Sequence, residues 1–433
     1  MKQGLLDEAK DIFVSMKQIE NFDLRYHQFP KEVSRVALPK INDLMSKISF
    51  YENPKTLDDL LSSELYKRLE SNKRYLDKKI NDESDDFESV KTQFAIPEDD
   101  LAYLESWLKD NKEKVPEAIN LVYISDTKLD RTDLSPLFDI PEIKEKANIA
   151  AKETITRYHS ALSKMIEDYI PTDNQLSKIK VYHTMTNRSY FMLNFNLLAI
   201  SIMNILSMGD DTNIIINHGT LIKQYGHEVM GHALNSILTK MSDLPDFVKD
   251  GLDGIIKSTG ESVAQHFEKT IFETLQESPE TQKELGIDSI YDSIYKINTS
   301  LSFVDEYQLK LMQYEIAIIA ENPNENKSSE GIKKKLSRIL DISIDPKLSR
   351  LRVDNMRHNI DFDGNLNPVF MSELKYAAKP VDRAIREFEK RGLYYSDPND
   401  RKIIDRTLLT GYWTPSGLVA NAKLTAEKYS KDN

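Results

Sequence analysis

The stretch YGHEVMGHALN, residues 225–235, places His227 and His232 five positions apart, with Glu228 directly after the first histidine. An α-helix turns by about 100° per residue, so side chains five positions apart diverge by about 140° and cannot both reach one ion. One additional residue in a single turn, a π-bulge, brings such positions onto one face, and these bulges concentrate at functional sites. The spacing therefore predicts a helix that departs from regular α geometry between Glu228 and His232.

Two glycines, Gly226 and Gly231, flank the histidines. In a helix interior each glycine costs about 1 kcal/mol relative to alanine, which is unfavourable unless the backbone requires it. Two histidines around a glutamate on one helix are typical of zinc sites, in which both imidazoles bind the ion. We therefore interpret His227 and His232 as metal ligands and expect the two glycines to serve the same site.

A catalytic zinc ion needs a third protein ligand and an open coordination position. The stretch STGESVAQHFEKTIFETL, residues 258–275, predicts another helix downstream. Ser258 or Thr259 is expected to cap this helix, which places Glu261 in its first turn as the third ligand. The alternative is that Glu261 is a solvated first-turn acid that the helix dipole stabilises.

Composition limits the other functions open to this chain of 433 residues. It has no cysteine, which excludes disulfides, thiolate ligands and cysteine nucleophiles, so a metal must be bound by His, Asp or Glu. The formal net charge of −12 argues against nucleic acid and anionic membranes as partners. The N-terminal sequence MKQGLLDEAKDIF lacks the apolar core of a signal peptide, so the expected location is cytoplasmic. The oligomeric state is left open.

The hydrophobic pattern predicts a mainly α fold. Apolar residues three or four apart among charges predict helices over 56–79, 98–114 and 143–169. Partial alternation over 178–198 predicts a small β-element just before the histidine-bearing helix. The apolar stretch 191–208 contains three asparagines, so we expect a buried core element there and no membrane span.

The length favours two regions packed together as one unit. We expect an N-terminal helical lobe over 1–175 and a catalytic zinc-binding region over 176–433. The stretch ENPNENKSSEG, residues 321–331, is the clearest predicted loop.

HEVMGHAL, residues 227–234, and ESVAQHFE, residues 261–268, together resemble the gluzincin zinc metallopeptidases. The second stretch has the form E-S-x-x-x-x-aromatic-E of the thermostable carboxypeptidase and thimet oligopeptidase branch. The first resembles the expanded HExxxH motif of the dipeptidyl peptidase III branch, HExxGH, whose second motif, E-E-x-x-A-E, matches only at Glu261 and Ala264. A bacterial family with the motif HExxPGHH is similar too. The resemblance covers about 178–268 and implies a two-lobed, helical metallopeptidase-like fold.

The chemistry of these residues predicts a mechanism. Zinc held by His227, His232 and Glu261 would lower the pKa of its bound water and polarise a substrate carbonyl. Glu228, adjacent to a ligand, would act as the general base and pass the proton to the leaving amine. Gln265 or Asn235 is a candidate to orient a ligand through a hydrogen bond.

The stretch LLTGYWTPSGLVANAKL, residues 408–424, resembles the glycine-tyrosine-aromatic segment that closes the cleft in the thermostable carboxypeptidases. This makes Tyr412 a candidate for the phenol that stabilises the oxyanion. The alternative is a core aromatic beside Trp413. Three further residues are candidates for the same role: Tyr394, Tyr395 and His358. Three other histidines are interpreted as structural: His183, His218 and His266.

These observations predict a zinc-dependent metallopeptidase, a carboxypeptidase or oligopeptidase, that hydrolyses peptide bonds of oligopeptides in a deep cleft. Peptides are favoured because an edge strand within 190–198 would let a substrate add by main-chain hydrogen bonds. Carboxypeptidase action would need a cation for the terminal carboxylate, and four arginines are available: Arg350, Arg352, Arg357 and Arg383. The alternatives are a zinc hydrolase of non-peptide amides and a non-catalytic helical protein with a vestigial metal site.

Overall fold

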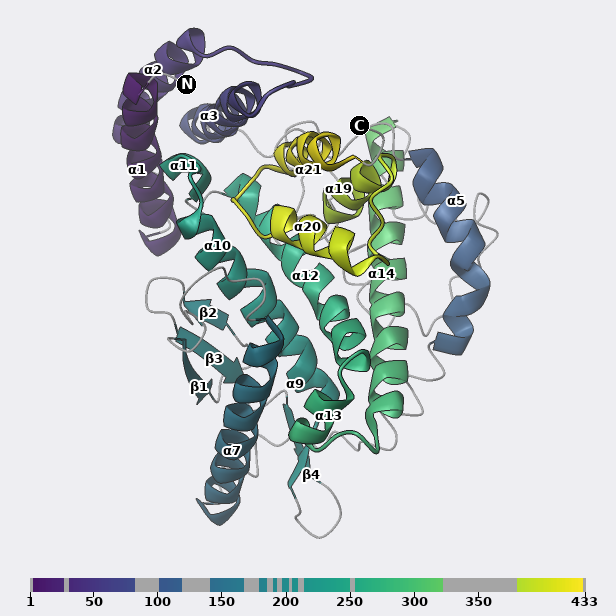
Figure 1. Ribbon diagram of the computed structural model, residues 1–433. Coiled ribbons are helices and arrows are strands. Elements are labelled where there is room, and N and C mark those ends of the chain that lie inside the picture. The colour runs from purple at the N-terminus through teal and green to yellow at the C-terminus, as the bar shows by residue number, and fades with distance from the viewer. Residues whose placement is uncertain are drawn as a thin grey trace. The chain divides into compact units, whose positions relative to one another are not determined.

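The structure of the chain is a computed structural model, shown in Figure 1. It describes residues 3–26, 31–81, 101–118, 141–166, 179–184, 190–192, 197–201, 205–208, 214–249, 254–321 and 380–430. Helices account for most of these residues and the strands are few and short, which confirms the prediction of a mainly α fold.

The chain divides into two compact units that alternate along the sequence. Unit 1 comprises residues 1–112, 242–262 and 308–433, and unit 2 comprises 113–241 and 263–307. The predicted division between residues 175 and 176 lies outside the described part of the chain. Three of the boundaries fall inside helices: the 3-10 helix η2 (Lys112–Lys114), α12 (Gly254–Gln276) and α14 (Tyr291–Glu321).

The described elements of unit 1 are all helices. Its elements outside α12 and α14 are α1 (Gln3–Tyr26), α2 (Lys31–Lys47), α3 (Leu57–Asn81), α5 (Leu101–Asn111), α11 (Asp246–Lys249), α19 (Pro380–Glu389), α20 (Pro398–Leu408) and α21 (Pro415–Tyr429). Helices α1, α2 and α3 pack in sequence, and α21 packs against both α3 and α19.

A buried ion pair ties three segments of unit 1 together. The Arg68 guanidinium, 1 % exposed, donates to the Glu64 carboxylate at 3.1 Å and to the backbone carbonyls of Phe247 and Tyr412. Glu64 in turn accepts hydrogen bonds from the backbone N–H and the hydroxyl of Thr414, both at 2.7 Å. Buried charges are tolerated when their hydrogen-bonding capacity is met in this way.

Unit 2 contains the strands. Those of the first sheet are β1 (Lys180–Thr184), β2 (Tyr190–Met192) and β3 (Leu197–Ser201), in the order β1-β3-β2; β3 pairs parallel with β1 and antiparallel with β2. A separate antiparallel pair joins β4 (Leu206–Met208) to β5 (Ile214–Ile216). The apolar stretch 191–208 thus supplies parts of both sheets. Its residues Leu198 to Ile200 are buried, as predicted, and no described helix has the length and apolarity to cross a membrane.

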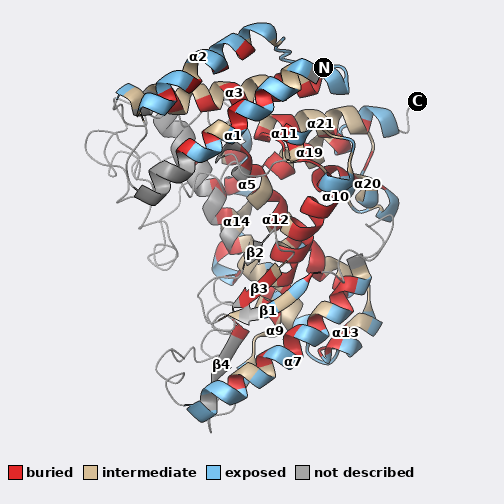
Figure 2. Cartoon of the chain, turned by 90° about the vertical axis from the view of Figure 1, so that its left-hand side faces the viewer, coloured by how far each residue is buried: buried red, intermediate tan, exposed pale blue. Residues whose placement is uncertain are grey.

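The remaining helices of unit 2 include the one that carries the histidine motif. They are α7 (Pro141–Ile166), α9 (His218–Tyr225), the π-helix η7 (Gly226–Leu234), α10 (Asn235–Met241) and α13 (Pro279–Leu285). Helix α7 packs against β1, α9 and α13, and β2 packs against η7. Figure 2 shows buried and exposed residues alternating along α7, as expected of an amphipathic helix.

The predicted helices agree with α3, α5 and α7 in their described parts, and the extended segment agrees with β1, β2 and β3. The predicted loop begins where α14 ends, at Glu321, and its remaining residues lie outside the described part of the chain.

Candidate metal centre

The helix that carries the two histidines has the predicted irregular geometry. The Asn217 side chain caps α9 by accepting a hydrogen bond from the backbone N–H of Thr220, and α9 then continues directly into the π-helix η7. The wider turn brings the rings of His227 and His232 together, with their centroids 4.9 Å apart and their planes at 82°. A regular α-helix would hold these rings on divergent faces. The prediction of a π-type irregularity is therefore confirmed.

The two glycines allow η7 to approach α12 closely. A Cβ atom added at Gly226 would stand 2.6 Å from the carbonyl oxygen of Phe267. One added at Gly231 would stand 2.6 Å from Cβ of Ala264 and closer still to its Cα. Real Cβ atoms do not come within 3.0 Å of such neighbours, so both positions require glycine. The two glycines thus serve the histidine site by letting the helix that carries the histidines pack closely against α12.

Glu261 lies farther from the N-terminus of its helix than the sequence predicted. Helix α12 begins at Gly254, so Ser258 and Thr259 lie inside it, and the prediction that one of them caps the helix is wrong. The apolar face continues upstream of these residues, because Ile256 is buried in the core. Glu261 is accordingly the eighth residue of α12, beyond the first turn to which stabilisation by the helix dipole is confined.

His227, His232 and Glu261 form a group that fits a metal ion. One donor atom from each lies within 4.8 Å of the other two, and all three side chains are partly exposed. Donors around a tetrahedral zinc ion lie about 3.3 Å apart, given zinc–ligand bonds of about 2.0–2.1 Å, so side-chain movements of about 1 Å would close the set. Two imidazoles and one carboxylate are also the ligand set of known catalytic zinc sites.

A carboxylate on the neighbouring helix orients His227. Glu268 accepts a hydrogen bond from Nδ1 of His227 at 2.7 Å, which leaves Nε2 of that ring as the donor atom for a metal. The other oxygen of Glu268 pairs with Lys223 at 3.1 Å. Burial alone would raise the pKa of Glu268, but the Lys223 ammonium and His227 together hold this pKa below its ordinary value. Glu268 is therefore an ionised acceptor that fixes the His227 tautomer.

The residue that orients His227 is Glu268, which was not among the predicted candidates, Gln265 and Asn235. A role for Gln265 toward another residue of the group stays a prediction. The Asn235 side-chain oxygen is buried without a hydrogen-bond partner among the described residues, so it accepts nothing from a histidine. Glu268 follows Glu261 by seven residues, which places both residues on one face of α12. This spacing is the feature of the sequence from which Glu268 could have been identified as a residue near the site.

We expect Glu268→Gln to weaken zinc binding about 10–100-fold, because loss of an acceptor behind a ligating histidine typically has this effect. Glu273→Gln is a matched control, since Glu273 lies on the same helix and pairs with Lys269 at 3.7 Å. Competition with a chromophoric chelator measures both affinities. Equal zinc affinities for the two variants would remove Glu268 from the site.

Glu228, the predicted general base, lies in η7 directly after His227 and is 7 % exposed. Its burial is consistent with a role inside a site and distinguishes it from a solvated surface acid. Its carboxylate is not part of the His227, His232 and Glu261 group.

The predicted oxyanion donors belong to unit 1 or lie outside the described residues. The backbone N–H of Tyr412 donates to the carbonyl of Val248 at 2.9 Å, and its own carbonyl accepts from Arg68. The Tyr395 hydroxyl donates to the buried Asp405 carboxylate at 2.8 Å, and Tyr394 is 54 % exposed. A catalytic role for Tyr412 stays a prediction. Four predicted residues lie outside the described part of the chain: His358, Arg350, Arg352 and Arg357.

Two of the histidines interpreted as structural have clear packing roles. Nδ1 of His218 lies 2.6 Å from the Tyr158 hydroxyl, and the two rings stack. His266 packs edge-on against the ring of Phe267. Both observations agree with the structural interpretation. For His183, in β1, the structure describes the backbone only.

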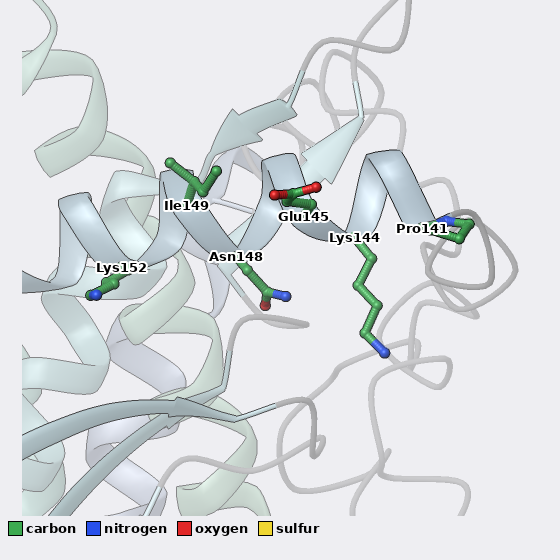
Figure 3. Close-up of a pocket in the computed structure, with 6 residues that line it drawn as sticks. All are labelled: Pro141, Lys144, Glu145, Asn148, Ile149 and Lys152. Atoms are coloured by element: carbon green, nitrogen blue, oxygen red, sulfur yellow. The ribbon is translucent and has the colours of Figure 1, made fainter.

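A shallow hollow lies along the first half of α7, away from the histidine motif in sequence (Figure 3). The described residues that line it all come from this one helix: Pro141, Lys144, Glu145, Asn148, Ile149 and Lys152. They include no histidine and no residue of the candidate metal group. The hollow therefore adds nothing to the chemistry of that group.

No protein-family model matches this chain, and neither a curated protein nor a solved structure matches it. The functional argument consequently rests on the geometry of the chain's own residues.

Proposed function

We propose that this protein is a zinc-dependent metallopeptidase that hydrolyses oligopeptides. The observation that carries the proposal is that His227, His232 and Glu261 place one donor atom each within 4.8 Å of the other two. The two histidines reach this arrangement through a π-helix, a rare geometry that is found mostly at functional sites. The resemblance of both motifs to the gluzincin metallopeptidases supports the same conclusion.

The roles of the individual residues follow from their positions. Zinc bound by the three ligands would acidify a water molecule in its open position and polarise the substrate carbonyl. Glu228 would accept the proton of that water and deliver it to the leaving amine. Glu268 holds the His227 ring in the orientation that presents Nε2, and Lys223 keeps Glu268 ionised.

Strand β2 favours peptides over other amides as substrates. It lies at the edge of the described three-stranded sheet and packs against η7, the helix with both histidines. An extended peptide could pair with such an edge by main-chain hydrogen bonds. A zinc hydrolase of non-peptide amides is the alternative, and comparing peptides with simple acyl-amides as substrates distinguishes the two.

The direct test is metal analysis of the purified chain and of His232→Ala. The wild-type protein is expected to bind close to one zinc ion per chain, and the variant to lose it, because two remaining ligands do not hold zinc tightly. His266→Ala is a matched control, since His266 lies outside the ligand group. Full zinc content in His232→Ala would overturn the ligand assignment, and a metal-free wild-type protein would overturn the proposal.

A further inference from the structure

A buried polar cluster joins α7 to the end of α9, directly before the metal-binding motif. The Tyr225 hydroxyl lies 2.8 Å from Oγ of Ser163 and 3.1 Å from Nδ1 of His159. It also donates to the backbone carbonyl of His159 at 3.4 Å. Tyr225 is 2 % exposed, so water has little access to these hydrogen bonds. No step of the proposed hydrolysis uses this cluster.

The position of Tyr225 links the cluster to the candidate ligands. Tyr225 is the last residue of α9, and the next two residues are Gly226 and His227. On one face this helix is held to α7 through Tyr225, whereas Gly226 packs against the backbone of Phe267 in α12. These contacts on two faces, made by adjacent residues, define the rotation of the helix about its own axis.

Rotation of this helix matters more for metal binding than for packing. A group about 5–6 Å from a helix axis moves by about 1.5 Å when the helix rotates by about 15°. Metal–ligand bonds tolerate deviations of only about 0.2 Å, so such a rotation would carry His227 and His232 together out of bonding distance of an ion shared with Glu261 on α12. A hydrophobic contact alone is non-directional, but a hydroxyl with three partners fixes one orientation.

We propose that Tyr225 is a positioning residue for the metal centre, which acts through its hydrogen bonds to Ser163 and His159 by fixing the rotation of the helix that carries His227 and His232. This inference rests on the proposed zinc site. It assigns a role in metal affinity to a side chain that is not itself a ligand.

The chain supplies a matched control for this role. The Tyr158 hydroxyl also makes a buried hydrogen bond between α7 and α9, to His218, at 2.6 Å. His218 is the first residue of α9, nine residues before His227, so this bond lies at the opposite end of the helix from the ligands. Tyr158→Phe and Tyr225→Phe therefore each remove one buried tyrosine hydroxyl from the same interface.

The test is the zinc affinity of the full chain, measured by chelator competition, in the wild-type protein and both variants. We expect Tyr225→Phe to weaken zinc binding about tenfold or more, and Tyr158→Phe to change it less than about twofold. The melting temperatures of both metal-free variants are expected to fall by similar amounts. The visible spectrum of bound Co²⁺, which depends on coordination geometry, should change only in Tyr225→Phe.

If Tyr225→Phe does not fold, Ser163→Ala replaces it, because this change removes the shortest hydrogen bond of Tyr225 without altering the ligand-bearing helix. Equal zinc affinities for Tyr158→Phe and the Tyr225→Phe or Ser163→Ala variant would overturn the inference and leave the zinc site intact. Absence of zinc binding in the wild-type protein would instead overturn the proposed function.

Discussion

Glu228→Gln is expected to retain zinc and the fold, while its rate of hydrolysis of a short peptide falls at least about a hundredfold. Glutamine is nearly isosteric with glutamate, so the buried position next to His227 stays filled. Its amide cannot accept a proton from water, however, and a positioned general base typically contributes about 10²–10⁴-fold to the rate. Peptide binding should survive, because the change removes an interaction that stabilises the transition state.

The measurements for this variant are zinc content, melting temperature and kcat with a short peptide. Glu273→Gln, the same substitution at a position paired with Lys269, serves as the control and should hydrolyse peptide at the wild-type rate. A Glu228→Gln protein that cleaves at nearly the wild-type rate would remove Glu228 from the mechanism. One that loses zinc would make Glu228 a ligand, and another carboxylate would then have to be the base.

Local sequence was sufficient to predict the irregular helix and the three residues that the structure brings together, His227, His232 and Glu261. The five-residue spacing of His227 and His232 is incompatible with a shared ion on a regular helix, so the π-helix follows from helix geometry alone. Glu261 could be identified because the ligand type and the intervening length matched a known arrangement. The helices α3, α5 and α7 were predictable because their apolar residues repeat with the period of an amphipathic helix.

Features that depend on the contact between helices could not be predicted in the same way. The partner of His227 depends on how η7 crosses α12, and the sequence did not identify Glu268 for this role. The start of α12 was misplaced because Ser258 and Thr259 resemble a cap, whereas burial of Ile256 extends the helix upstream. Local propensity is a weak prior that packing overrides in such cases.

Gly231→Ala is expected to disrupt both packing and metal binding, although it adds a single methyl group. The new Cβ would stand 2.6 Å from Cβ of Ala264 and closer still to its Cα, so η7 and α12 must move apart. Overpacking of this kind typically costs about 1–3 kcal/mol of the free energy of unfolding, and occasionally more. Since His232 lies on one helix and Glu261 on the other, we also expect zinc affinity to fall at least about tenfold.

Gly260→Ala is the control that isolates the contact between the helices. Gly260 lies inside α12 beside Glu261, and a Cβ added there meets nothing within 4 Å. In a helix, replacing glycine by alanine stabilises by about 0.5–1 kcal/mol, and this gain is common to both variants. The difference between their free energies of unfolding therefore measures the clash at Ala264 alone. Denaturant unfolding and chelator competition supply the two measurements. If Gly231→Ala matched Gly260→Ala in both stability and zinc affinity, η7 and α12 would not be in the close contact that brings the two histidines to Glu261.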